Sequence, residues 1–401
     1  MTIYDIAKLY RDSNATVQFM GEYEDTYSGD KYSSLGSGVV VASTGYRTKN
    51  LPTNITASRG SYIATNYHVV DFLDNSGYTN KSLKVRAEDE IEYDCEVLWV
   101  NKNLDVAVVY ADVSYNYITM KDRWVACEQN QRLDYEPAFA IGSPLEKQNI
   151  NRMTVGNIAS NNEVTMFTSE TVYVTYDSAG AHYTPVKTAG NQTPLDVLDN
   201  VYEKVIDISV GISGGNSGGG IFDANGNLVG LATLGTSADQ TGGNQLNGAV
   251  PIYPIIKVID KVIANHESST NYKIYTASTL GIAGIDETEA AYAKAFKEEN
   301  HSSYFFVNGT FYANTYSIYF DFEGDGYEIL TNSNTYNQLI NVRTGAIITS
   351  IKTADGVEHK INDRNDLLYL LIGLNEGDSM VVTYETERLF GTNVSMVNVT
   401  V

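Results

Sequence analysis

Cysteine and long apolar runs are both scarce in this sequence. Only Cys95 and Cys127 occur among 401 residues, which excludes a disulfide-built scaffold and a cysteine-based metal site. The two thiols either form one bridge or are buried separately, and both alternatives stay open. Because the chain has no run of about 18 apolar residues, no segment is expected to cross a membrane as a helix.

Positive charge is also in short supply. The chain has 27 lysines and arginines against 49 acidic residues, which gives a formal net charge of −22. This balance argues against a nucleic-acid partner, because phosphate binding needs clustered basic side chains. Residues 1–5 lack the basic and then apolar layout of a signal peptide. We therefore expect either a cytosolic protein or one whose export segment has been removed.

The first two thirds of the sequence hold short apolar segments separated by glycine-, asparagine- and serine-rich turns. This pattern predicts an all-β barrel architecture, closed by a helix with an apolar face over residues 255–263. Residues 42–60 are expected to form a polar loop, and residues 165–200 a long extended insertion. The expected strands cover residues 16–19, 34–41, 61–66, 83–87, 95–100, 106–109, 137–142, 153–159, 205–210, 221–223 and 228–234.

A different kind of sequence follows a polar linker at residues 267–279. Its aromatic and β-branched segments alternate with two helical patterns, and Asp363 is placed to cap the second of them. We expect a small α+β domain over residues 280–401. Its elements are a helix at 286–299, strands within 303–331 and at 345–351, a helix at 363–374, and closing strands at 378–385 and 393–401.

The stretch from Gly211 to Gly220 contains six glycines around Ser217. Glycines this dense allow backbone conformations that are closed to other residues and leave peptide N–H groups unshielded. A serine nucleophile with an oxyanion hole needs such a turn. The alternative is a tight hairpin that contains a structural serine.

A serine nucleophile requires a histidine as general base and a carboxylate that orients it. His68 ends one apolar strand and Asp105 begins another, so His68, Asp105 and Ser217 all lie at predicted strand edges. A single histidine beside apolar residues is more often structural, but the three contexts in this order favour a triad. The other histidines, His182, His266, His301 and His359, lie in the insertion or beyond the barrel segments.

Three blocks around these residues resemble those of chymotrypsin-fold serine proteases, most closely the HtrA/DegP-like branch. They are Thr65-Asn66-Tyr67-His68-Val69-Val70-Asp71, Leu104-Asp105-Val106-Ala107-Val108-Val109 and Gly215-Asn216-Ser217-Gly218-Gly219. Further matching blocks are Ser34–Val39, Ala140–Pro144, Thr154–Ile158 and Val250-Pro251. The resemblance implies a mainly β fold with two six-stranded barrels in residues 1–266, divided near residue 130.

The C-terminal segment resembles the PDZ domain of that family. Leu280-Gly281-Ile282 stands at the carboxylate-binding loop, residues 344–351 at the core strand and residues 363–374 at the groove helix. Several departures from the family pattern are visible. Gly220 replaces the usual proline, and the segment from Ile208 to Gly214 is longer than usual. Residues 42–60 and 165–200 are extra, and residues 303–325 form an aromatic insertion.

The resemblance implies a serine endopeptidase that needs no cofactor and no metal. Ser217 would attack the scissile carbonyl, His68 would transfer the proton and Asp105 would orient the imidazole. The oxyanion hole would be formed by Gly215, Asn216 and Ser217. The expected substrate-binding residues are Gly211, Ile212 and Ser213 at an uncharged pocket and Ala232, Thr233 and Leu234 as a strand that pairs with the substrate.

The expected partners are unfolded or extended polypeptides in protein quality control, with peptide C-termini at the PDZ-like domain. A homotrimer and an extracytoplasmic or cell-surface location are implied by the resemblance alone. One rival hypothesis is a binding module whose barrel is inactive or closed. A second rival, a structural or adhesive surface protein suggested by the tyrosine- and asparagine-rich insertions, leaves the three blocks unexplained.

Overall fold

The computed structural model carries side chains for most of the protein. It describes residues 2–45, 57–101, 104–121, 135–144, 148–177, 180–184, 187, 189–235, 247–268, 282–285, 303–307, 310–314, 327–332, 346–372, 374, 377–388 and 391–400. None of the helices in these ranges is long and apolar enough to cross a membrane.

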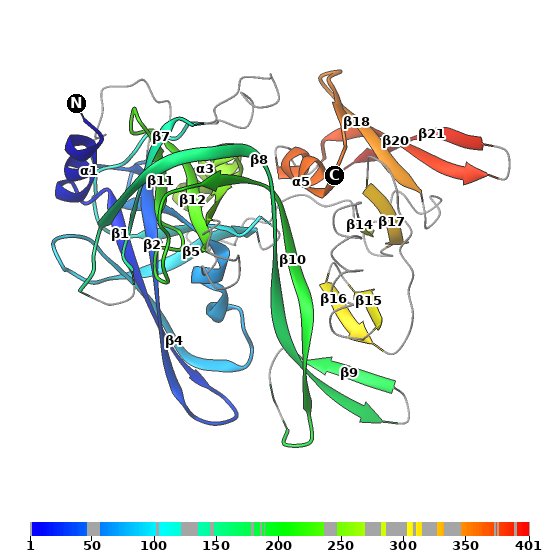
Figure 1. Cartoon of the computed structure of the whole chain (residues 1–401), viewed down its shortest axis with the longest axis horizontal. Coiled ribbons are helices and arrows are strands. Elements are labelled where there is room, and N and C mark those ends of the chain that lie inside the picture. Colours follow the sequence, from blue (N-terminus) through cyan, green and yellow to red (C-terminus); the bar gives the residue numbers. More distant parts are fainter. Residues whose placement is uncertain are drawn as a thin grey trace. The chain divides into compact units, whose positions relative to one another are not determined.

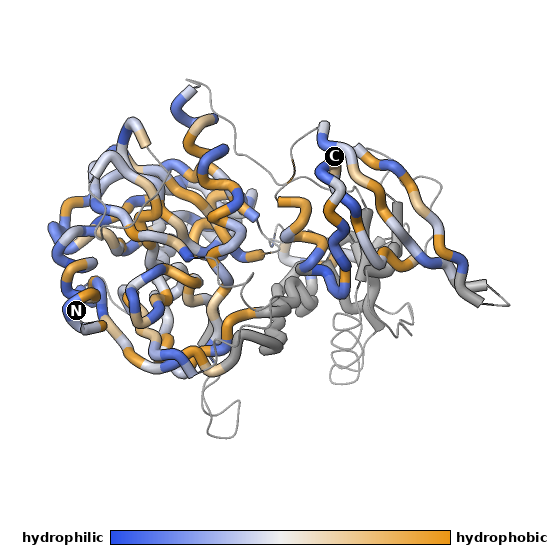
Figure 2. Tube along the Cα trace, turned by 90° about the horizontal axis from the view of Figure 1, so that it is seen from above, coloured by the Kyte–Doolittle hydropathy of each residue, from blue (hydrophilic) through white to orange (hydrophobic). Residues whose placement is uncertain are grey.

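The chain divides into two compact units (Figure 1). The first unit comprises residues 1–164 and 204–276, and the second comprises residues 165–203 and 277–401. The insertion expected at 165–200 therefore belongs to the same unit as the C-terminal segment, a grouping that the sequence pattern did not indicate. In both units, short hydrophobic stretches alternate with hydrophilic ones along the described residues (Figure 2).

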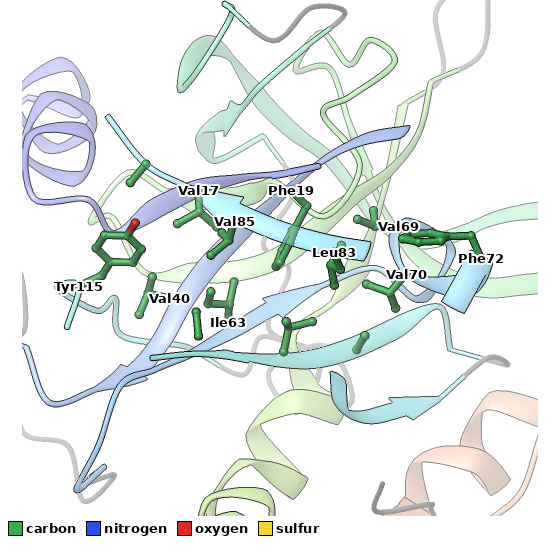
Figure 3. Close-up of a cluster of buried hydrophobic side chains, with 14 residues drawn as sticks. Val17, Phe19, Val40, Ile63, Val69, Val70, Phe72, Leu83, Val85 and Tyr115 are labelled. Atoms are coloured by element: carbon green, nitrogen blue, oxygen red, sulfur yellow. The ribbon is translucent and has the colours of Figure 1, made fainter. Parts of the chain in front are cut away.

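The first unit begins with helix α1 (Ile3–Asp12), which Thr2 caps through a reciprocal contact with Asp5. A closed six-stranded barrel follows, with the strand order β1-β2-β3-β6-β5-β4. Valines, Phe19 and Ile63 fill its interior (Figure 3), so the strand-forming residues of the sequence also build its core. The strands are β1 (Thr16–Asp25), β2 (Lys31–Ser43), β3 (Ser61–Thr65), β4 (Tyr78–Arg86), β5 (Tyr93–Asn101) and β6 (Val106–Ala111).

A second ring of six strands follows the path β10-β13-β12-β11-β7-β8 and closes through the pairing of β10 with β8. The prediction of two six-stranded barrels is thereby confirmed, whereas the division near residue 130 lies outside the described residues. The strands are β7 (Pro137–Gly142), β8 (Arg152–Asp177), β10 (Thr193–Ile208), β11 (Gly220–Asp223), β12 (Leu228–Gly235) and β13 (Asn247–Pro251).

Helix α3 (Tyr253–Ser268) ends the first unit and buries the apolar face expected from its sequence, including Ile255, Val258, Ile259, Val262 and Ile263. Cys95 on β5 is a free thiol in the described structure. Cys127 lies outside the described residues, so the two alternatives for these cysteines, one disulfide or two separate thiols, both stay open.

In the second unit, β8 and β10 extend beyond the barrel. β9 (Gly180–Thr184) pairs with the end of β8, and Leu198 of β10 pairs with Phe311 in the hairpin β15 (Ser303–Val307) and β16 (Thr310–Asn314). The insertion is thus extended, as predicted, and β15 and β16 lie within the segment expected to hold aromatic strands.

A separate sheet in the second unit has the order β14-β17-β18-β20-β21, with β19 paired to β18. Helix α5 (Arg364–Ile372) packs Leu367 and Leu371 on this sheet, and Asp363 accepts a hydrogen bond from the Asp366 amide (2.9 Å), as expected of a cap. The helix expected at 286–299 lies outside the described residues. The strands are β14 (Ile282–Ile285), β17 (Tyr327–Asn332), β18 (Ile347–Thr353), β19 (Glu358–Lys360), β20 (Ser379–Arg388) and β21 (Gly391–Thr400).

Candidate active site

His68 and Asp105 come together because β3 and β6 pair antiparallel. Thr65 lies opposite Ala107 in that pairing, so the segment leaving β3 and the segment entering β6 meet at one end of the barrel. There the short helix η1 (Tyr67–Val69) carries His68. Its Nδ1 lies 2.9 Å from Oδ2 and 3.0 Å from Oδ1 of Asp105, and its amide donates to Oδ1 at 3.0 Å.

The Asp105 carboxylate is buried, with 1% of the residue's surface exposed, yet it is well supplied with donors. Besides the two donors of His68, Thr233 on β12 of the second barrel donates through Oγ1 to Oδ2 at 2.7 Å. A buried carboxylate must be hydrogen-bonded to remain charged at low cost. The anion is therefore fixed from both barrels, with the imidazole held by Nδ1.

This arrangement changes the acidity of the His68 imidazole, whose side chain is 40% exposed. Burial disfavours the charged form and lowers the pKa of His68. The charge and hydrogen bond of Asp105, with a smaller contribution from Asp71, outweigh that effect and raise the pKa above the ordinary histidine value. The site thus favours an imidazolium once a proton has been taken up, which is the property required of a general base.

Ser217 is partly exposed in a turn between β10 and β11. Gly215 has φ of +89° and Gly218 has φ of +80°, a region that favours glycine. The Asn216 amide donates to the Ser213 carbonyl at 2.9 Å, and the Gly219 amide donates to the Asn216 carbonyl at 2.8 Å. The glycines are therefore required by the turn itself.

The backbone amides of Gly215 and Ser217, which flank Asn216 in this turn, have no acceptor among the described residues. Donors left in this state are what an oxyanion hole requires. Asn216, which was expected from the sequence to contribute to that hole, lies between them, but its own amide is engaged by the Ser213 carbonyl. The geometry therefore favours Gly215 and Ser217 as the donors.

Asn66 links the serine turn to the His68–Asp105 pair. Its Nδ2 donates to the Asp105 carbonyl at 2.9 Å, and its Oδ1 accepts from the Gly218 amide at 2.6 Å. Asn66 is fully buried, so these bonds are shielded from water and hold the three segments in one place.

Ser37 on β2 fastens the same turn from the other side. Its Oγ donates to the Gly215 carbonyl at 2.7 Å and accepts from the Ser143 amide at 2.8 Å, while its own amide donates to the Ser217 carbonyl at 2.8 Å. The Ser37 carbonyl accepts from Thr65 Oγ1 at 2.7 Å. One residue of the first barrel thus fixes the carbonyls of Gly215 and Ser217.

Residues 36–231 match the family model of the trypsin-like peptidase domain. Serine protease Do-like HtrA of Lactococcus lactis subsp. lactis is 23% identical over 283 residues, which cover 68% of this chain and 59% of that protein. The protein of the same name from subsp. cremoris is 25% identical over 261 residues, which cover 64% of this chain and 50% of that protein. These matches identify a trypsin-like peptidase domain in residues 36–231 and support an HtrA/DegP-like serine protease.

The chain spans about half the length of the curated HtrA relatives that it matches. The solved structure of the HtrA-type protease AlgW with a decapeptide has a TM-score of 0.54 and 17% identity, and the likeness covers 99% of this chain and 98% of that one. At this identity the likeness concerns the fold, which agrees with the two barrels described above.

The residues expected to bind substrate in this HtrA-like protein fall into two groups. The first group, Gly211, Ile212 and Ser213, lies between β10 and the serine turn. The Gly211 carbonyl accepts a hydrogen bond from Thr154 Oγ1 at 2.9 Å, and Ile212 packs against the core of the second barrel. On β12, both backbone groups of Ala232 already bond to Gly218 and Gly219. The backbone of Ala232 is thus already engaged within the protein, contrary to its expected pairing with a substrate.

Several supporting residues were not assigned roles from the sequence. Asn66 and Ser37 lie inside segments that match the family, but their hydrogen bonds join residues far apart in the sequence and leave no local signal. Thr233 was assigned from the sequence only to the strand expected to pair with the substrate backbone, and its side chain also bonds to Asp105. Gly220 stands where the family usually has proline. A Cβ added to Gly220 would collide with the Phe222 ring, so the absence of a side chain at this position makes room for that ring.

The predicted peptide loop of the PDZ-like domain is only partly described. Leu280 and Gly281 lie outside the described residues, and Ile282 is the first residue of β14, which pairs with β17 at the edge of its sheet.

Proposed function

We propose that the protein is a serine endopeptidase in which Ser217 is the nucleophile, His68 the general base and Asp105 the orienting carboxylate. The observation that carries the proposal is the buried Asp105, bonded to both His68 and Thr233, at the end of the barrel where Asn66 also holds the serine turn. Nδ1 of His68 faces the carboxylate, so Nε2 is the ring nitrogen left for the serine.

In the first step, His68 removes the Ser217 proton as Oγ attacks the scissile carbonyl, and Asp105 stabilises the resulting imidazolium. The amides of Gly215 and Ser217 donate to the negative oxygen of the tetrahedral intermediate. The imidazolium then protonates the leaving amine, and water hydrolyses the acyl-enzyme by the same proton transfers in reverse. Residues of this protein supply each of these roles.

The proposed substrates are unfolded or extended polypeptides, which an exposed strand segment recognises through main-chain hydrogen bonds. The β12 segment that follows Ala232 is the proposed pairing strand. The solved relatives with a bound tripeptide or decapeptide support peptide binding. A role in protein quality control outside the cytoplasm and assembly as a homotrimer are proposed from the family resemblance.

The PDZ-like segment is proposed to bind peptide C-termini beside β14. An edge strand presents unpaired N–H and C=O groups to which an extended peptide can add, and β14 has a paired neighbour on one side in the described sheet.

The test is labelling with a fluorophosphonate probe, which requires an activated serine and an oxyanion hole but no particular substrate. We expect the unmodified protein to be labelled, and Ser217→Ala and His68→Ala to lose labelling while both variants remain folded. Absence of labelling in the unmodified protein, even with unfolded casein or C-terminal peptides added, would refute the proposal and favour the binding-module alternative.

A further inference from the structure

Asn247 is a buried polar residue for which the proposed mechanism has no use. It is the first residue of β13, between Ile208 of β10 and Gly235 of β12 in the sheet. Only 2% of its surface is exposed. Its Nδ2 donates to the Val210 carbonyl at 2.9 Å, whereas its Oδ1 is buried without a hydrogen-bond partner among the described residues.

An unsatisfied acceptor at this place is unfavourable for folding. Ile208, which pairs with Asn247, belongs to the apolar core of the second barrel, as do Val210 and the pair two residues along, Ile206 and Ala249. A buried acceptor without a partner is costly, because it has given up its hydrogen bonds to water and gained none in the protein. Such groups are rare in native structures and call for a specific explanation. The bond from Nδ2 to the Val210 carbonyl accounts for the donor of the Asn247 amide, but nothing among the described residues accounts for its acceptor, which points to a ligand.

Two segments beside Asn247 lead directly to the proposed catalytic residues. Val210, which accepts its Nδ2 bond, is followed by Gly211–Ser213 and then by the turn of Ser217. Gly235, paired with Asn247, lies two residues beyond Thr233, whose side chain bonds to Asp105.

A substrate strand that pairs with β12 beyond Ala232 would place the side chain before the scissile bond between these two segments. We propose that Oδ1 of Asn247 accepts a hydrogen bond from that side chain, so that the protease prefers a small or medium residue carrying a donor, such as threonine or serine, over an apolar residue of the same size. The inference rests on the proposed function and refines the expectation of an uncharged pocket at Gly211–Ser213.

The preference can be measured with two fluorogenic peptides that differ only in threonine or valine before the scissile bond, because these side chains have nearly the same shape. We expect the unmodified protein to give a threonine-to-valine ratio of kcat/KM of about 10 or more, since a site built to bond a hydroxyl discriminates strongly against its absence. In Asn247→Leu the ratio should fall to about one or below.

Asn157→Leu is the matched control. Asn157 lies on β8 of the same barrel and also donates through Nδ2 to a backbone carbonyl, that of Tyr135 (3.1 Å), but it is exposed. This variant should keep the ratio of the unmodified protein. If Asn247→Leu does not fold, Asn247→Ala serves in its place, and the ratio in the unmodified protein still tests the inference.

Fluorophosphonate labelling of every variant distinguishes failure of this inference from failure of the proposed function, because the probe carries no residue for this site. A labelled protein with a ratio near one, as expected if a trapped water satisfies Oδ1, overturns the role of Asn247 and leaves the proposed protease intact. A ratio that Asn247→Leu leaves unchanged does the same. Failure of the unmodified protein to label removes the proposed function itself.

Discussion

Ser37→Ala should separate the positioning of the serine turn from ordinary folding stability. The substitution removes one hydroxyl that bonds to the Gly215 carbonyl and to the Ser143 amide, in a residue with only 1% of its surface exposed. Each orphaned group costs about 1–3 kcal/mol, so the free energy of unfolding should fall by roughly 2–6 kcal/mol if no water enters. The backbone bonds of Ser37 to Ser217 and Thr65 remain.

The effect on activity follows from the Gly215 carbonyl, because its peptide group lies between the Gly215 and Ser217 amides and would then be held only by the Asn216 amide. Loss of one oxyanion-hole donor costs about 10²–10³ in kcat, and we expect a decrease approaching that range with little change in KM. The measurements are kcat and KM on an unfolded protein substrate, the fluorophosphonate labelling rate, and the unfolding temperature.

Ser43→Ala is the control for Ser37→Ala, because Ser43 lies on the same strand β2 and is also buried. Its Oγ donates to the Tyr115 carbonyl at 2.6 Å and accepts from the Gly45 amide at 2.9 Å. The Ser43→Ala variant should lose about as much unfolding free energy as Ser37→Ala but keep the kcat of the unmodified protein. Equal kcat values in the two variants would refute the reasoning and make Ser37 a residue of stability alone.

Three further predictions concern the same site. Thr233→Val should lower kcat/KM roughly 10- to 100-fold by removing a donor to the buried Asp105, with rescue by Thr233→Ser; full activity in the valine variant would contradict this role. Because the pKa of His68 is raised, kcat/KM should fall on acidification through a midpoint above the ordinary histidine value, and Asp71→Asn should lower that midpoint, which a pH profile measures. Gly218→Ala should lower the unfolding temperature, because φ there is +80° and an added Cβ would overlap atoms of the first barrel; an unchanged temperature would exclude strain.

The His68–Asp105 pair also changes stability with pH in a definite direction. Since the folded-state pKa of His68 is raised, the protonated pair contributes stability that is fully present below the unfolded pKa of histidine and is lost as the pH rises through the folded pKa. Acidification therefore strengthens this pair while it removes the neutral imidazole that catalysis needs.

Much of the fold and the three proposed catalytic residues could be predicted from sequence because their signals are local. Gly215 and Gly218 must be glycine for the backbone angles of one turn, and His68 and Asp105 each adjoin an apolar strand whose alternation is visible in the sequence. Similarly, Asp363 precedes a helix that it caps. In each case the physical requirement is met by residues within a few positions of one another.

Only the tertiary structure decided which distant groups meet. The bonds from Thr233 to Asp105, from Ser37 to Gly215 and from Asn66 to Gly218 join segments separated by 128 to 178 residues, and nothing in the local pattern distinguishes these side chains from other buried serines, threonines and asparagines. The unpartnered amide oxygen of Asn247 likewise depends on the register of β10, β13 and β12. The sequence by itself determined the turn, the strands and the reactive side chains, because those follow from backbone freedom and periodicity. The closing of the two barrels determined their hydrogen-bond partners, since partner choice depends on strand order and register in space.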